Sequence, residues 1–176
     1  MAGGSTICTW VKATDYGGNN GNFGFSTLIW DIYYRSQMLG VNNDGNVYFL
    51  AHWDGGNQVW HTTGAPFSTG AWHHLCVTYN DSGTSNLPIF YVDGSSVAST
   101  TNTACCAGAD SYSGDDVQVL RSDIYGAGRF NGVMDELLQY HGILSSSAIS
   151  NLYSCGIDGS HCGSPNHGFT NFLNHA

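Results

Sequence analysis

The sequence predicts an all-β domain built as a sandwich or a barrel of short strands. Runs in which apolar and polar residues alternate recur from residue 5 to residue 140, and clusters of Gly, Asn, Asp and Ser separate them. The 176 residues suit one domain with one core, and hydrophobic residues make up 41% of them. Charged residues account for only 10%, against about 25% in an average soluble domain. Such uncharged polar composition is typical of extracellular or virion β-proteins.

The first strands are expected between residues 6 and 50. They span 6–12, 25–34 and 37–41, with a glycine- and asparagine-rich loop over 15–22. Asn43-Asp44-Gly45-Asn46 predicts a tight turn into a further strand at 47–50. The segment from 51 to 60 is predicted to be a long loop that carries aromatic residues.

The second half of the chain predicts strands at 72–79, 117–120 and 131–140, with a loop over 101–116. A hairpin is predicted where residues 88–92 join residues 95–97 through Asp93-Gly94, because Asp-Gly favours the type I′ turn.

One short helix is predicted near the C-terminus. Ser145 suits the N-cap, Leu144 and Ile149 are spaced as a hydrophobic staple, and Gly156 can end the helix. We therefore predict a sandwich domain over residues 1–156. Residues 157–176 form a Gly-, Asn- and His-rich tail, expected to pack on this domain or on a neighbour.

The charge balance argues against nucleic-acid binding. The formal net charge is −9, and the chain has only four Lys and Arg residues, so no basic stripe can follow a phosphate backbone. No apolar run approaches the roughly 20 residues of a membrane span. Met1 leads straight into a strand-like segment without a signal peptide. We expect a processed or recombinant fragment, or a protein that leaves its cell without such a signal, located extracellularly, at the cell surface or in a virion.

Six cysteines favour an oxidising environment, although spacing alone does not decide their pairing. Structural disulfides or buried thiols are favoured over zinc, because the spacing lacks a C-x₂₋₄-C pair. Cys155–Cys162 is predicted as a disulfide that closes a small loop. Cys8 and Cys76 are predicted to be buried thiols at small core positions.

Four segments, in this order, resemble the laminin-G-like (pentraxin-like) branch of the concanavalin A-like lectin/glucanase superfamily. They are residues 6–12 (TICTWVK), 69–79 (TGAWHHLCVTY), 90–94 (FYVDG) and 130–137 (FNGVMDEL), the last followed by Tyr140, Leu144-Ser145, Ile149 and Leu152-Tyr153. The resemblance implies a jelly-roll sandwich of two antiparallel sheets with one short C-terminal helix. It also implies a glycan- or protein-binding module, often with calcium. The strand that usually precedes the Trp-Val-Lys strand is missing, so the tail or a neighbouring subunit is expected to cover the exposed edge.

The segment from 52 to 61 is the predicted ligand-binding loop. Its candidate residues are His52, Trp53, Asp54, Asn57, Gln58 and Trp60. Indole faces can stack on pyranose rings, and carboxylates and amides can hydrogen-bond to sugar hydroxyls. The alternative is that Trp53 and Trp60 flank a hairpin and pack as cross-strand core residues.

Two features suggest metal binding. Asp135 matches the acidic position in the last-strand motif of the superfamily, where the resemblance implies a calcium ion. His73-His74 are adjacent in a strand, so their side chains should face opposite ways and not chelate one ion. We expect one inward, hydrogen-bonded histidine and one exposed histidine.

Catalysis is not expected. Glycoside hydrolysis needs two carboxyl groups facing each other, whereas the chain has one glutamate, Glu136, next to Asp135. Neighbouring residues of a strand point to opposite faces. The sequence therefore predicts a non-enzymatic lectin-like recognition or adhesion module that binds carbohydrate or a surface partner. The first alternative is a structural virion protein or extracellular filament subunit that assembles through an exposed sheet edge, and the second is a polysaccharide-active enzyme.

Overall fold

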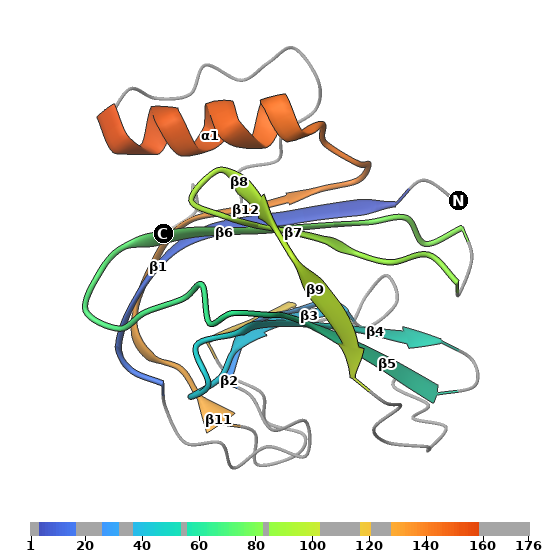
Figure 1. Cartoon of the computed structure of the whole chain (residues 1–176), viewed down its shortest axis with the longest axis horizontal. Helices are drawn as coiled ribbons and strands as arrows, with labels where there is room; N and C mark the ends of the chain where they lie inside the picture. The colour runs from blue at the N-terminus through green and yellow to red at the C-terminus, as the bar shows by residue number, and fades with distance from the viewer. Residues whose placement is uncertain are drawn as a thin grey trace. The chain divides into compact units, whose positions relative to one another are not determined.

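A computed structural model gives the fold, and it describes residues 4–16, 26–31, 37–53, 56–82, 85–102, 117–120 and 128–158. The predicted fold class is confirmed, because the described residues form strands in two sheets and one helix near the C-terminus (Figure 1). The strands are β1 (Ser5–Asp15), β2 (Ser26–Asp31), β3 (Gln37–Val41), β4 (Val47–Trp53), β5 (Gly56–Thr62), β6 (His73–Tyr79), β7 (Ile89–Val92), β8 (Ser95–Val97), β9 (Ser99–Asn102), β10 (Val117–Val119), β11 (Gly128–Arg129) and β12 (Asn131–Tyr140). The helix is α1 (Ser146–Asp158).

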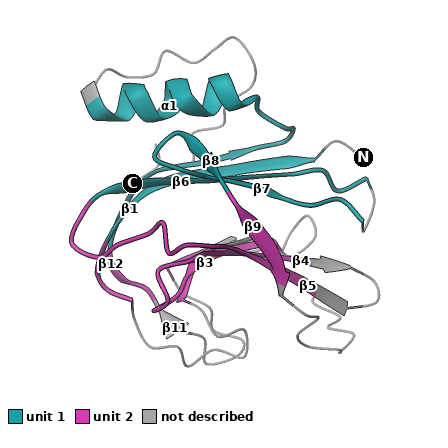
Figure 2. Ribbon diagram, viewed as in Figure 1, with its two compact units in different colours: residues 1–12, 72–97, 133–176 teal, residues 13–71, 98–132 magenta. Residues whose placement is uncertain are grey.

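The chain divides into two compact units, each containing one sheet (Figure 2). Unit 1 comprises residues 1–12, 72–97 and 133–176, and unit 2 comprises residues 13–71 and 98–132.

Unit 1 is organised by a five-stranded sheet in the order β12-β1-β6-β7-β8. β1 and β6 pair antiparallel from Ser5 opposite Tyr79 to Val11 opposite His73. The predicted hairpin joins β7 to β8, and Asp93 and Gly94 have φ angles of 50° and 76°. Positive φ at both central residues is what a type I′ turn requires, which explains why Asp-Gly stands there.

Both faces of β1 are buried. Thr6, Ile7, Cys8 and Thr9 follow one another along the strand, and each is at most 1% exposed. Because successive strand residues point to opposite faces, neither face of β1 is open to solvent at this point. On the face with Cys8, a cluster forms from Cys76 and Tyr91 of the sheet and Ile149 of α1; Leu138, Leu144 and Leu152 pack against it.

The helix α1 covers this face of the sheet of unit 1 (Figure 1). Its N-cap is confirmed, because Ser145 Oγ accepts a hydrogen bond of 3.2 Å from the backbone N–H of Ala148. The prediction that Gly156 ends the helix is wrong, since α1 continues to Asp158. Gly156 instead lies against the Trp10 indole, where the absence of a side chain allows close approach. The expected tail beyond residue 158 lies outside the described residues.

Unit 2 is organised by a seven-stranded sheet in the order β10-β2-β3-β4-β5-β9, with the short β11 paired parallel to β2. The other strand pairs of this sheet are antiparallel. All five residues of β3 are buried, as expected for a central strand covered on both faces.

Two sequence predictions in unit 2 need correction. The predicted loop at 51–60 is the paired end of β4 and β5, and the buried pair Phe49–Trp60 stabilises this hairpin. Cross-strand packing of large apolar side chains therefore outweighs the loop signal of Asp54-Gly55-Gly56. Residues 99–102 form β9 against β5, so the predicted loop of 101–116 begins two residues later than expected.

Candidate functional site

One end of the seven-stranded sheet is a straight row of paired residues. The register places Val117, Asp31, Gln37, Ala51 and Gln58 opposite one another across β10, β2, β3, β4 and β5. Among the described residues, only β4 and β5 continue beyond this row. They add the pairs His52–Asn57 and Trp53–Gly56, so the end of this hairpin projects past its neighbours.

Three connections of the chain leave the sheet at this end. Residues 32–36 join β2 to β3, residues 54–55 join β4 to β5, and residues 103–116 join β9 to β10. The connecting residues lie outside the described part of the chain, but the strand ends that carry them are close neighbours in the register. This end of the sheet therefore brings segments distant in sequence to one edge.

The predicted ligand-binding residues separate into two groups. His52, Trp53 and Asn57 lie on the projecting end of the hairpin, and Gln58 is half-buried at the row itself. Asp54 lies outside the described residues. Trp60 is only 1% exposed and its ring stacks on Phe49, with centroids 6.1 Å apart. Trp60 is thus a core residue, which agrees with the alternative interpretation and corrects its assignment to a sugar-facing position.

The opposite end of the same hairpin carries a polar network that the sequence analysis did not identify. Tyr48 donates a 2.8 Å hydrogen bond to the Asp44 carboxylate, and the His61 ring stacks on Tyr48 at 5.0 Å. Burial, together with the neighbouring Asp44 carboxylate, raises the pKa of Tyr48 above its usual value. Burial would raise the pKa of Asp44, but hydrogen bonds from Asn46 and Tyr48 lower it overall.

This network fixes a turn and does not present free groups. Thr62 Oγ1 accepts from Val47 N–H at 2.9 Å and donates to Asn46 Oδ1 at 3.2 Å. Asn46 Oδ1 also accepts from Ala65 N–H at 3.1 Å. Because these polar atoms bond to one another, the network stabilises the turn before β4 rather than forming a binding surface.

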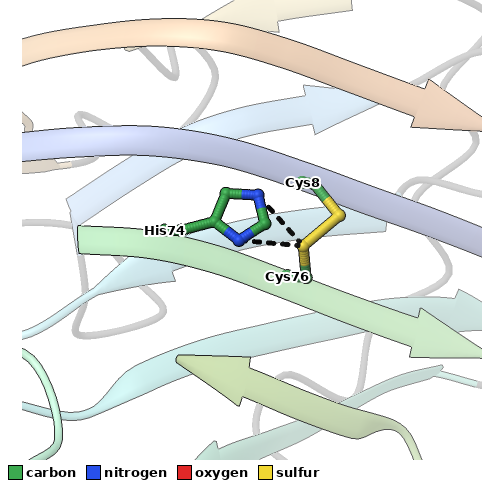
Figure 3. A group of neighbouring side chains, drawn as sticks. All are labelled: Cys8, His74 and Cys76. Atoms are coloured by element: carbon green, nitrogen blue, oxygen red, sulfur yellow. Dashed lines mark hydrogen bonds between the residues drawn. A yellow bond between two sulfur atoms is a disulfide. The ribbon is translucent and has the colours of Figure 1, made fainter. Parts of the chain in front are cut away.

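A second cluster of reactive side chains lies in unit 1, between its sheet and α1. Cys8 and Cys76 are directly opposite each other in β1 and β6 and form a disulfide, with Cα atoms 4.1 Å apart (Figure 3). The prediction of two buried thiols is therefore wrong, although both residues are buried as expected. The predicted Cys155–Cys162 disulfide is not formed either, since Cys155 is a free, half-buried thiol. Cys162 lies outside the described residues.

His74 completes this cluster. Its ring nitrogens Nε2 and Nδ1 lie 3.6 and 3.9 Å from Cys76 Sγ (Figure 3). The side chain is only 3% exposed, and this burial lowers its pKa to about 4 although Asp93 acts in the opposite direction. In the described part of the chain, Cys8, His74 and Cys76 form the one group of three His, Cys, Asp or Glu residues whose ligand atoms converge.

The two adjacent histidines differ as expected from strand alternation. His74 is buried beside the disulfide, whereas His73 lies 2.9 Å from the Asp93 carboxylate on the other side of the strand. Asp93 Oδ1 also accepts from the backbone N–H of His74 at 3.0 Å. The β7–β8 turn is thereby tied to β6 at this point.

Asp135, the predicted calcium ligand, is exposed on β12. Its Oδ1 accepts a 2.8 Å hydrogen bond from Glu136 N–H, and its backbone carbonyl accepts from Thr9 Oγ1. Glu136 has a φ of 48°, which interrupts the strand, and both acidic residues are exposed. Simple strand alternation therefore does not describe this pair, and the prediction that they face opposite ways fails locally.

Residues 2–150 match the family described as the concanavalin A-like lectin/glucanases superfamily. The chain belongs to this superfamily. The resemblance seen in the sequence is thereby confirmed. A comparison with curated protein sequences finds no match.

Solved structures of the superfamily's fold are similar to this chain. The sialidase carbohydrate-binding module CBM40 of Ruminococcus gnavus, bound to α2,3-sialyllactose, has a TM-score of 0.62 at 14% identity, covering 86% of this chain and 83% of that one. A heptameric SAP-like pentraxin of Limulus polyphemus has a TM-score of 0.56 at 16% identity over 88% and 71%. The structure titled for the dependence of botulinum neurotoxin type C cell entry on two ganglioside molecules gives 0.53 at 14% identity over 86% and 36%. At these identities the likeness shows the fold, an antiparallel jelly-roll sandwich. No helix in the described part of the chain is long and apolar enough to span a membrane.

Proposed function

We propose that this chain is a non-enzymatic, lectin-like recognition module that binds carbohydrate at the projecting end of the β4–β5 hairpin. The observation that carries the proposal is the register at this end of the seven-stranded sheet. The pairs His52–Asn57 and Trp53–Gly56 extend beyond the row formed by the neighbouring strands. A projecting hairpin with an indole, an imidazole and an amide offers the residue types that sugars need.

The residue types at this edge suit a neutral or weakly polar ligand. Indoles give flat apolar area for a pyranose ring, and amides both donate and accept hydrogen bonds with hydroxyl groups. Gly56 lies directly opposite Trp53 and has no side chain of its own. Proteins of similar fold support the class of ligand, since one is titled as bound to sialyllactose and another as dependent on gangliosides.

The proposal excludes hydrolysis on chemical grounds. Retaining and inverting glycosidases place two carboxyl groups about 5–9.5 Å apart across the scissile bond. The sequence has a single glutamate, and it stands next to Asp135 on β12, in a strand that takes no part in the hairpin end. Recognition at an extracellular or cell-surface location is the function that fits this residue distribution and the disulfide.

The test is a glycan array probed with the whole chain and with two hairpin variants, Trp53→Ala and Asn57→Ala. We expect a restricted set of glycans to bind, and each variant to lose at least about ten-fold in affinity, equivalent to about 1.4 kcal/mol. Asn43→Ala is the matched control, because Asn43 is exposed in the turn at the other end of β3 and β4. Its binding should equal that of the unaltered chain.

Two outcomes would overturn the proposal. The first is an absence of glycan binding combined with assembly of the chain into particles or filaments, measured by light scattering and electron microscopy. That result would favour a structural role. The second is equal binding by the hairpin variants and the unaltered chain, which would move the site elsewhere.

Calcium at Asp135 stays a prediction. The exposed carboxylate is available to a cation, and the superfamily resemblance is what suggests the ion. The array should therefore be repeated with a chelator and with Asp135→Asn. If calcium supports binding, chelator and variant should reduce it equally; if neither changes it, the calcium prediction is wrong while the hairpin proposal stands.

A further inference from the structure

We propose that Cys8, His74 and Cys76 form a redox-controlled site for a thiophilic divalent cation, with Zn²⁺ as the natural candidate. In the oxidised chain, the two sulfur atoms form the disulfide of Figure 3. In the reduced chain, the same sulfur atoms and the His74 imidazole bind the ion. Disulfide and metal are thus alternative states of the same three residues.

The geometry of the cluster supports this site. The three ligand atoms lie within 4.8 Å of one another. Zinc binds sulfur at about 2.3 Å and imidazole nitrogen at about 2.0–2.1 Å, so a tetrahedral angle separates the two ligand atoms by about 3.6 Å. His74 Nε2 lies 3.6 Å from Cys76 Sγ. The imidazole therefore already stands at ligand distance from the sulfur it would share an ion with.

The backbone positions these side chains without rearrangement. Cys8 and Cys76 are direct partners in the β1–β6 register, and Cys8 is fixed opposite Cys76 by the ladder on either side. His74 is two residues before Cys76 in β6, so both side chains lie on the same face of the strand. Reduction of the disulfide frees the sulfur atoms to separate, while the strand pairing keeps all three residues on one face.

Burial favours a divalent ion over free thiolates. Cys8 and Cys76 are 1% exposed and His74 is 3% exposed, and they lie under α1 beside Tyr91 and Ile149. An unpaired charge in such surroundings is costly. Two thiolates and a neutral imidazole around a divalent cation carry no net charge, so the complete site avoids this cost. Zinc with three protein ligands keeps one position open.

The chemical steps balance with a dithiol as reductant. The dithiol gives two electrons and two protons to the Cys8–Cys76 disulfide, so that the protein gains two thiols and the dithiol becomes a disulfide. Binding of one Zn²⁺ then releases the two thiol protons as the thiolates coordinate the ion. Oxidation of the thiolates by a disulfide of higher potential reforms the Cys8–Cys76 bond and releases the ion.

The test uses Co²⁺, whose thiolate complexes absorb in the near ultraviolet, and the whole chain in oxidised and reduced forms. We expect about one equivalent of Co²⁺ to give a thiolate charge-transfer band in the reduced chain, and Zn²⁺ to displace it. The oxidised chain should give no band. Cys8→Ser, Cys76→Ser and His74→Ala should each weaken binding by more than the about 10–100-fold that loss of an outer-shell partner causes.

His73→Ala and Cys155→Ser are the matched controls. His73 is the neighbour of His74 but pairs with Asp93, and Cys155 is a thiol on α1 outside the cluster. Both variants should bind Co²⁺ like the unaltered chain. Circular dichroism of every reduced protein reports whether the fold persists.

The proposal is overturned if the reduced, folded chain gives no thiolate band. It is also overturned if the band survives Cys8→Ser and Cys76→Ser, since other cysteines would then hold the ion. Loss of the fold on reduction, with no recovery when Zn²⁺ is added, would contradict it as well.

Discussion

Gly156 of α1 lies directly against the indole of Trp10 in β1. A Cβ atom built at Gly156 would stand 2.4 Å from Trp10 Nε1 and 2.7 Å from Cε2. The same indole stacks on the Tyr153 ring, with centroids 5.6 Å apart and planes at 19°. The helix is therefore held against the sheet of unit 1 at a position where only glycine fits.

Gly156→Ala should destabilise the chain, although alanine is the better helix former. Helix propensity alone favours alanine by about 1 kcal/mol. The clash with a buried ring outweighs this gain, because overpacking typically costs about 1–3 kcal/mol. Urea unfolding measures the difference. Asn151→Ala, at an exposed position of the same helix, is the control and should stabilise slightly. A Gly156→Ala chain as stable as this control would contradict the close contact.

A second pair of glycines separates backbone strain from contact. Gly94 and Gly70 have φ angles of 76° and 82°, so alanine is strained by about 1–2 kcal/mol at either position. A Cβ at Gly94 would lie 2.9 Å from the Tyr153 ring, whereas nothing lies within 4 Å of one at Gly70. We expect Gly94→Ala to lose more stability than Gly70→Ala by about 1–3 kcal/mol, measured by thermal unfolding. Equal losses would show that the turn does not press on α1.

Local chemistry explains which parts of the fold the sequence could predict. Asp93-Gly94 predicted the β7–β8 hairpin because the turn type depends on two adjacent residues. Ser145 predicted the start of α1 because an N-cap acts within one turn. The resemblance to the superfamily rests on short segments of this kind, and it supplied the two-sheet arrangement that no single segment determines.

The features that the sequence analysis missed depend on pairing between distant strands. The Cys8–Cys76 disulfide joins residues 68 positions apart, and it needs a β1–β6 register that nothing near either cysteine reveals. Trp60 seemed available to a ligand because its burial requires Phe49 on the neighbouring strand. Gly156 was interpreted as a helix end because its true partner, Trp10, lies in the first strand.

The disulfide should contribute strongly to stability. A cross-link between residues 68 positions apart limits the unfolded chain, and removal of a native disulfide typically costs about 2–4 kcal/mol. We expect a dithiol reductant, added with a chelator, to lower the urea midpoint of the unaltered chain. The double variant Cys8→Ala/Cys76→Ala should be less stable and indifferent to the reductant. Peptide mapping by mass spectrometry checks the pairing first, and any peptide linking Cys155 to another cysteine would contradict it.

His74 should make the chain less stable as the pH falls from about 6.5 towards 4. Burial lowers the pKa of His74 to about 4 in the folded chain, from 6.5 for a free side chain. Between these values the unfolded chain binds a proton that the folded chain does not, so acid favours unfolding. Below about pH 4, both forms bind the proton and the dependence ends. One pKa unit corresponds to about 1.36 kcal/mol, so the full loss is on the order of 3 kcal/mol.

Urea unfolding at several pH values between 4 and 7 measures this dependence. His74→Gln removes the titrating ring from its buried place beside Cys76 and should flatten the profile in this range. A baseline loss of stability in the variant is expected at all pH values, so the slope and not the midpoint is the quantity to compare. Carboxylates elsewhere contribute equally to both proteins because the substitution does not alter them. If the variant keeps the slope of the unaltered chain, the acid sensitivity has another origin and His74 is not held neutral by burial.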